Sequence, residues 1–381
     1  MRFPEFNNAY KEIKLKNVLT RHSNVVNKDP NESYYQIGIR SHGKGIFYKE
    51  PEKGREIGDK RIFWIVPNCL IINIVFAWER AVAKTTNKEL GMVASHRFPM
   101  YKVNENSLDY VLHYLLTEKG EKLLKMASPG GAGRNKTLNQ EDFLNSKIFL
   151  PSFKEQEKIS LLLSLLEKRI ATQIKIIEDL ITLKKSIIER TFSIVDSSWN
   201  EFSFKDIFNE RKEMHIKDSS VIHATLSKEG IFPKTDRYDR DFLVKDEDKK
   251  YKVSYLNDIC YNPANLKFGV ITRNNYGKCI ISPIYVTYEV KPSFNSKFIE
   301  LFVTRSTFLK EIRKYEQGTV YERMAVSSDD FLTYTTRLPS IGFQNKIVNK
   351  IDIIDKKITQ EKIYLELLKK QKNYLLSNLF I

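Results

Sequence analysis

Apolar residues recur with alternating steps of three and four in two long stretches of the chain, Leu150–Ser193 and Leu338–Ile381. This spacing is typical of a helix that buries one stripe in a coiled coil. We therefore expect two helices of about 35 residues, each roughly 50 Å long at about 1.5 Å per residue. The apolar positions are Leu163, Leu166, Ile170, Ile177, Leu180 and Ile187 in the first stretch, and Ile351, Ile354, Ile358, Leu365, Leu368 and Leu375 in the second.

The two stretches are copies of one another. Shifted by 188 positions, from Leu150 to Leu338, they align without a gap. Each copy opens with Pro-Ser, where Ser152 or Ser340 is placed to cap the first amides of a helix. The identical residues include Pro151 and Pro339, Gln156 and Gln344, Ile159 and Ile347, Lys168 and Lys356, and Lys184 and Lys372. An internal repeat of this length predicts a duplicated architecture.

Polar residues interrupt each apolar stripe at two equivalent positions, Gln173 and Lys184 in the first copy and Glu361 and Lys372 in the second. If the helices pack antiparallel about a pseudo-twofold axis, one register sets Lys184 opposite Glu361 and Gln173 opposite Lys372. Our hypothesis is that these polar layers fix the register of the helix pair. The alternative is that both lysines extend past the edge of the stripe into solvent.

Strand and helix patterns alternate in the rest of the chain. In residues 1–149, Ile62–Ala83 is the most apolar stretch and predicts buried strands, and Asn106–Lys125 has helical spacing. The same order recurs in residues 197–337, where Phe298–Tyr315 is the amphipathic helix. The aromatic side chains of the first apolar stretch, interpreted as core rather than as a surface for stacking, are Trp64, Phe76 and Trp78.

These patterns divide the chain into four parts and predict an α+β fold with a pseudo-twofold internal repeat. We expect two tandem mixed α/β domains with β-sheet cores, over residues 1–150 and 197–338. A central long helix over residues 151–196 separates them, and a C-terminal long helix over residues 339–381 packs antiparallel on it as a coiled coil.

The composition adds an argument from charge. There are 63 Lys and Arg residues against 47 Asp and Glu residues, which gives a net charge of +16 and favours a polyanionic partner. The alternative is a soluble protein that is merely rich in lysine. No stretch of about 18 apolar residues and no apolar leader is present, so we expect a cytoplasmic protein without a membrane partner.

Motifs for catalysis are weak. The three cysteines and six histidines lack metal-ligand spacing, and neither a P-loop nor a nucleophile elbow is present. Asn262-Pro-Ala-Asn265 is similar to the Asn/Asp-Pro-Pro-aromatic motif of amino-methyltransferases, but it lacks the second proline and the aromatic residue. Asp241 with Glu247-Asp-Lys249 imitates a nuclease motif within a run of charges. We expect no catalytic residue, no metal site and no cofactor on this chain.

One phrase occurs twice just before the long helices. It stands as EDFLNSKIFLPSFKEQEKI at Glu141–Ile159, and its second copy covers Asp329–Leu332 and Leu338–Ile347. The second copy differs from the first at Gly342 and Phe343, which leaves the start of that helix open. With this double phrase, essentially the whole chain resembles the DNA-specificity subunit of a Type I restriction-modification enzyme.

The resemblance implies separate roles for the domains, the long helices and the partner subunits. In that family, each of two target-recognition domains reads one half of a bipartite site in double-stranded DNA. The paired helices set the spacing between the halves and dock two DNA-methyltransferase (modification) subunits, which hold S-adenosylmethionine. Restriction and translocase subunits add chemistry that uses ATP and Mg. The chain itself is then a non-catalytic recognition subunit.

Two other classes of function remain open. One is a helix-rich assembly scaffold without DNA readout, and the other is a stand-alone adenine methyltransferase or nuclease.

Glycine-containing basic loops supply the candidates for DNA contact. Glycines expose backbone amides that suit phosphates, and Arg, Lys, Asn and Gln side chains read base edges. Solvated hairpins are the alternative interpretation. The candidates are Gln36, Arg40, His42, Lys44, Arg134, Asn135 and Lys136 in the first domain, and Thr225, Lys228, Lys234, Arg237, Asn265, Lys267, Tyr321 and Arg323 in the second.

Overall fold

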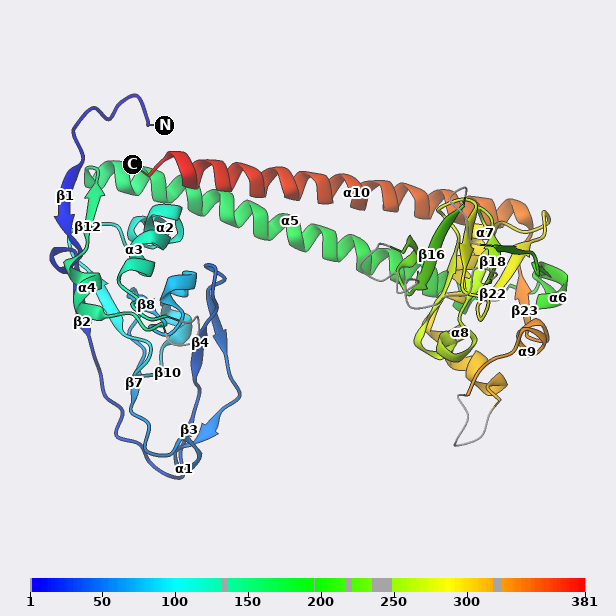
Figure 1. The fold of residues 1–381 in the computed structure, drawn as a ribbon, viewed down its shortest axis with the longest axis horizontal. Helices are drawn as coiled ribbons and strands as arrows, with labels where there is room; N and C mark the ends of the chain where they lie inside the picture. The colour runs from blue at the N-terminus through cyan, green and yellow to red at the C-terminus, as the bar shows by residue number, and fades with distance from the viewer. Residues whose placement is uncertain are drawn as a thin grey trace. The chain divides into compact units, whose positions relative to one another are not determined.

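The computed structural model describes residues 2–131, 136–194, 196–216, 221–234, 249–317 and 324–380. The chain divides into two compact units (Figure 1). The first contains Met1–Lys175 and Lys362–Ile381, and the second contains Ile176–Glu361. Each unit therefore combines one of the expected domains with a part of both long helices.

The long helices are α5, Phe153–Ser193, and α10, Ile341–Asn378, of 41 and 38 residues. Within each unit α10 runs antiparallel to α5 (Figure 1). In the first unit, for example, Glu167 pairs with Lys372 while Arg169 lies over the ring of Tyr364. The predicted apolar stripe is confirmed at its buried positions, which include Leu163, Leu166, Ile177, Ile351, Ile358, Leu368 and Leu375.

The first unit is built around a four-stranded antiparallel sheet in the order β2, β11, β8, β9. These strands are Leu19–His22, Met100–Val103, Leu70–Ile72 and Val82–Lys84. Pairs of short strands surround it: β1, Lys11–Lys14, with β12, Lys147–Leu150; β3, Ser33–Tyr34, with β6, Glu52–Lys53; β4, Ile37–Ile39, with β5, Ile46–Tyr48; and β7, Ile62–Trp64, with β10, Val93–Ser95.

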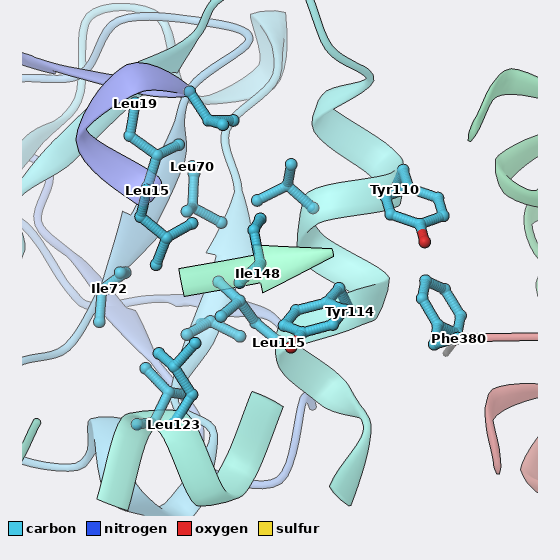
Figure 2. Close-up of a cluster of buried hydrophobic side chains, with 14 of the residues drawn as sticks. Leu15, Leu19, Leu70, Ile72, Tyr110, Tyr114, Leu115, Leu123, Ile148 and Phe380 are labelled. Carbon is cyan, nitrogen blue, oxygen red and sulfur yellow. The ribbon is translucent and has the colours of Figure 1, made fainter. Parts of the chain in front are cut away.

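Short helices cover the sheet of the first unit. The α-helices are α1, Gly54–Ile57, α2, Leu108–Leu116, α3, Glu118–Met126, and α4, Gln140–Asn145. The 3-10 turns are η1, Leu15–Asn17, η2, Ala77–Glu79, and η3, Asn87–Glu89. Side chains from α2, α3, β8 and β12 meet in one core (Figure 2).

The second unit has an equivalent four-stranded antiparallel sheet in the order β14, β22, β19, β20. These strands are Phe208–Glu210, Val286–Val290, Ile259–Tyr261 and Ile271–Arg273. A second sheet has the order β15, Met214–Ile216, β18, Lys250–Ser254, β21, Cys279–Ile281, β16, Ile222–Ser227, and β17, Gly230–Pro233. In it β16 runs parallel to β21, and the other neighbours are antiparallel.

The remaining elements of the second unit repeat those of the first. Strand β13, Asn200–Ser203, pairs with β23, Thr335–Leu338, as β1 pairs with β12. The helices and turns are α6, Phe204–Ile207, η6, Pro263–Phe268, α7, Ser296–Val303, α8, Ser306–Glu311, η7, Ile312–Tyr315, and α9, Ser328–Leu332. The predicted α+β fold class and the internal repeat are confirmed.

A buried glutamine joins each domain to the start of its long helix. Gln156 donates from Nε2 to the Pro151 carbonyl oxygen over 3.0 Å, and its Oε1 accepts from the Ser107 amide over 3.0 Å. Ser107 is the N-cap of α2. Gln344 makes the same two bonds at the equivalent positions of the second unit, each over 2.9 Å. These bonds account for the glutamine and proline that both copies of the repeated phrase share.

The difference between the two copies has a structural reason. Glu155 is buried and accepts two hydrogen bonds from the Arg2 guanidinium, over 2.8 and 2.7 Å. At the equivalent position Phe343 packs on Trp199 instead, with the ring centroids 6.1 Å apart. An ion pair in one unit is thus replaced by an aromatic contact in the other, and α10 still begins at Ile341.

The far end of each long helix inserts a phenylalanine into a domain. Phe380, just after α10, lies beside Tyr110 and Tyr114 of α2, with 4.9 Å between the Phe380 and Tyr110 centroids (Figure 2). Phe192, near the end of α5, lies 4.9 Å from Phe298 of α7. Both phenylalanines are buried, so the repeat places an equivalent aromatic contact in each unit.

We expect Phe192→Ala to destabilise the second unit by about 3 kcal/mol, because it empties a buried aromatic site. Hydrogen exchange of the full chain, followed by mass spectrometry, should show faster exchange in α7 and unchanged exchange in α2. Phe153→Ala, at an exposed position of the same helix, is the control and should change stability by less than about 0.5 kcal/mol. Equal destabilisation by the two variants would contradict the prediction.

Candidate nucleic-acid interface

In each unit a 3-10 turn follows an inner strand of the four-stranded sheet: η2 follows β8, and η6 follows β19. An asparagine follows that strand in both cases: Asn262 is the N-cap of η6, whereas Asn73 begins the bend before η2, whose N-cap is Phe76. Asn73 Oδ1 accepts from the Val75 amide, and Asn262 Oδ1 accepts from the Ala264 amide, each over 3.1 Å. The local role of Asn262 is therefore to cap η6, which explains the Asn-Pro pair without a methyltransferase site.

The described residues that follow the two glycine-containing loops are bonded beside these same turns. Leu138, at the end of the first loop, donates its amide to the Ile74 carbonyl over 2.8 Å. Val326, at the end of the second loop, donates its amide to the Pro263 carbonyl over 3.2 Å. Residues distant in sequence thus form the same edge in both units, which we call the turn edge: η2 with residues 136–138, and η6 with residues 324–326.

The basic loop Arg40–Gly45 is fixed onto the turn edge of the first unit. The His42 amide donates to the Glu79 carbonyl over 2.7 Å, and the Gly43 amide donates to the Arg80 carbonyl over 3.1 Å. Gly43 has a φ of +65°, where a Cβ atom would also collide with a leucine of α2. The segment is the turn of the β4–β5 hairpin, and these backbone bonds hold it against η2.

Three candidate side chains of this loop are exposed. Arg40, His42 and Lys44 all face solvent, and the Arg40 guanidinium lies 5.2 Å from the centroid of the Phe47 ring. Because backbone bonds hold the loop, these cationic and imidazole groups start from a defined position. This arrangement suits contacts to phosphates or base edges.

Lys136 also contacts η2. Its ammonium lies 5.2 Å from the centroid of the half-buried Trp78 ring. Phe76 is 40% exposed, so its assignment to the core was wrong. It immediately precedes η2, where the chain has left the sheet, and its side chain is available for stacking.

Gln36 does not belong to the exposed group. Its side chain is 8% exposed, and Nε2 donates to Glu52 Oε2 over 2.7 Å. The amide that would read a base is thus used inside the domain. The sequence analysis places Gln36 in the loop, whereas the structure buries it directly before β4, whose three residues are all buried.

In the second unit, η6 presents Asn265 and Lys267. Asn265 is exposed. Lys267 pairs with Glu316 over 3.7 Å, and its ammonium lies 5.5 Å from the centroid of the Phe268 ring. Phe268 is 57% exposed and was missed as a candidate. Its signal in the sequence is an aromatic residue directly before Gly269, which ends the turn with a φ of +82°.

The other described candidates of the second unit lie on the hairpin of β16 and β17. Lys228 is exposed in its turn, and Thr225 is half-buried opposite Phe232. Lys234 follows β17 and donates its amide to the His223 carbonyl over 2.8 Å. The hairpin packs against β20, the strand that follows η6.

Five of the candidate positions lie outside the described residues. They are Arg134, Asn135, Arg237, Tyr321 and Arg323. Asp241 and Glu247 of the nuclease-like run also lie outside them.

The lysines of the long helices form ion pairs with partners other than those predicted. Lys184 pairs with Asp355 over 2.5 Å, instead of Glu361, which pairs with Lys357 of its own helix over 2.6 Å. Lys372 pairs with Glu167 over 2.7 Å. The acids lie six residues before the predicted partners Glu361 and Gln173. The apolar stripe permits several registers and lysine side chains are long, so apolar spacing alone does not define the partner.

Chemistry for catalysis is limited in the described part of the chain. No group of three or more His, Cys, Asp or Glu side chains there is arranged to hold a metal ion. The three cysteines are buried, and burial raises the pKa of Cys260 to about 12 and that of Cys279 to about 11. None of the helices in the described ranges has the length and apolar character needed to cross a membrane.

We expect the thiols of the native chain to resist Ellman's reagent at pH 8. The thiolate is the reactive form, and a pKa of about 12 leaves only about one Cys260 in ten thousand ionised at that pH. Raising the pH towards 11 should increase the rate, and unfolding in guanidinium should release all three thiols. Rapid labelling of the folded chain at pH 8 would contradict the assigned burial.

Comparison with known proteins agrees with this geometry. Residues 71–180 match the family model of the Type I restriction modification DNA specificity domain. No curated protein matches the sequence of the chain. The HsdS subunit from Thermoanaerobacter tengcongensis is 14% identical, with a TM-score of 0.52, over 100% of this chain and 98% of that one.

Two further solved structures share the fold. The Type-I restriction-modification S subunit from M. genitalium is 13% identical, with a TM-score of 0.55, over 100% of this chain and 97% of that one. A chain from a structure of type I R-M complex assembly is 13% identical, with a TM-score of 0.61, over 98% of this chain and 97% of that one. Residues 71–180 thus resemble a Type I restriction-modification DNA specificity domain, and the whole chain shares the fold of the solved S subunits.

Proposed function

We propose that this chain is the cytoplasmic, sequence-specific DNA-binding subunit of a Type I restriction-modification complex. Each domain reads one half of a bipartite site in double-stranded DNA. The long helices set the spacing between the halves and dock two modification subunits. The observation that carries the proposal is the duplicated turn edge, which occurs at the same place in two domains whose four-stranded sheets have equivalent strand orders.

The side chains at the two turn edges support readout of DNA. In the first unit, Arg40, His42 and Lys44 are exposed beside η2, with Lys136 over Trp78. In the second unit, exposed Asn265 and Phe268 accompany Lys267 on η6. Cations position the phosphate backbone, and amide and guanidinium groups read base edges. The different side chains suit two different half-sequences.

The long helices support a role as a spacer. Each long helix is continuous, over 41 residues in α5 and 38 residues in α10, and contributes residues to both units. A continuous helix is stiff and of fixed length, so two readers attached to it suit half-sites that are about one turn of B-DNA, roughly 34 Å, apart.

Exposed apolar residues at equivalent positions support two docking surfaces. Phe153 and Ile341 are related by the repeat, as are Leu165 and Ile353, and all four are exposed. Large exposed apolar side chains are typical of protein contacts. One copy of each position in each unit suits two copies of one partner. S-adenosylmethionine, ATP and Mg belong to the modification and restriction subunits in this proposal, and this chain binds none of them.

The deciding experiment is single-molecule sequencing of methylated adenine in DNA from cells that contain this chain with its modification subunit. We expect a two-part motif that is absent when the chain is omitted. Inserting seven matched residues into both α5 and α10 should lengthen the gap and leave both half-sequences unchanged. Methylation without a motif, or a motif that does not depend on the chain, would contradict the proposal.

Binding to random duplex DNA separates a reader from a scaffold. We expect Arg40→Ala with Lys44→Ala to weaken binding and to reduce the slope of log K against log salt by about 0.9 for each phosphate that is no longer neutralised. Lys147→Ala is the control, because Lys147 is also exposed but lies on β12 and pairs with Glu12. An equal effect of the control, or no binding by the unmodified chain, would count against readout at the turn edge.

A further inference from the structure

In the first unit, one carboxylate joins three helices. Glu167 of α5 accepts from the Lys372 ammonium of α10, with 2.7 Å between Nζ and Oε1. The same oxygen lies 3.4 Å from Nε2 of His113 on α2. His113 is buried, so the domain helix contacts this carboxylate from inside the unit. We call this group the first carboxylate clamp.

The second unit contains an equivalent group, which we call the second carboxylate clamp. Asp355 of α10 lies 2.5 Å from Nζ of Lys184 on α5 and 3.2 Å from Nζ of Lys297 on α7. Lys297 also bonds to Asp352. A carboxylate of one long helix again joins the other long helix to a helix of the domain.

The internal repeat relates the two clamps. Glu167 and Asp355 differ by 188 positions, and so do Lys184 and Lys372. The domain cations differ, because His113 lies one helical turn further along α2 than the position equivalent to Lys297, which is Asp109. In both units the domain contacts the same carboxylate position, although the domain residue differs. This indicates that the contact between domain and carboxylate is selected.

The Glu167 carboxyl of the first clamp is ionised at neutral pH. Burial alone would raise the pKa of Glu167, but the hydrogen bonds from His113 and Lys372 outweigh it and lower this pKa to about 2. A charged carboxylate makes stronger hydrogen bonds than a neutral one, and it accepts from two donors here.

The clamps add a third attachment of each domain to its helices. In the first unit, Gln156 joins the domain to the start of α5, and Phe380 joins it to the end of α10. The clamp lies on a different turn of α5 from Gln156, so it opposes rotation of the domain about that contact.

We propose that Glu167 and Asp355 are positioning residues for specificity, because each fixes the angle of its domain on the helices and so restricts the gap between half-sites. This inference rests on the proposed function. A gap changed by one base pair turns one half-site by about 34–36° around the DNA axis, since B-DNA has about 10–10.5 base pairs per turn. A domain held by its clamp resists this rotation, and loss of the clamp lowers that resistance.

The test uses Glu167→Gln and Asp355→Asn in the full chain with its modification subunits. The DNA is a library in which the two half-sites of the unmodified chain are separated by gaps from two base pairs shorter to two longer. We expect the unmodified chain to methylate one gap. Each variant should raise methylation at the neighbouring gaps, relative to the original gap, on the order of tenfold, or about 1.4 kcal/mol. Both half-sequences should stay the same.

The control is Glu157→Gln, which removes the same charge from an exposed position of α5 and should leave the gap preference unchanged. Lys297→Met breaks the second clamp from the domain side and should act as Asp355→Asn does. A variant that is only less stable loses methylation at every gap in proportion, so the ratio between gaps isolates positioning from folding.

The outcomes separate this inference from the proposed function. Variants that keep the single gap of the unmodified chain, or that change a half-sequence instead, would overturn the role of the clamps alone. An unmodified chain that yields no two-part motif would overturn the proposed function, and the inference with it.

Discussion

Burial of the apolar stripes on α5 and α10 is the constraint on which the rest of the structure depends. Neither helix can shield its stripe alone, and in each unit the stripe joins the core of a domain. Leu163 and Leu375 share a core with Ile148 of β12, and Ile351 shares one with Phe298 of α7. The helices therefore form one wall of each domain, and each domain completes the burial that the helix pair begins.

Around this wall the duplicated contacts join specific polar and aromatic residues. Gln156 and Gln344 satisfy backbone groups that burial would otherwise leave unpaired, which is costly in a protein interior. Phe192 and Phe380 anchor the opposite ends of the helices. These contacts fix how a domain meets its helices while leaving the turn edges free to differ. A repeated frame with edges that vary is consistent with the two different half-sites that we propose.

The differences between the units follow the same logic. Where Glu155 binds Arg2 in the first unit, Phe343 packs on Trp199 in the second. Where His113 meets Glu167, Lys297 meets Asp355. In each case the position and the connection persist although the chemistry changes. Contacts that set the geometry thus recur at equivalent positions, whereas side chains at the turn edges, such as Lys136 and Asn265, have no such equivalence.

The sequence by itself determined the long helices, the internal repeat, the α+β class and the place of the basic loop at Arg40–Gly45. These follow from periodicity and local chemistry, which neighbouring residues carry along the chain. Phe76 and Gln36 were misplaced, because exposure depends on which strand or turn closes over a side chain. Only the tertiary structure decided the partners of Lys184 and Lys372, since long side chains reach across turns of another helix and apolar spacing permits several registers.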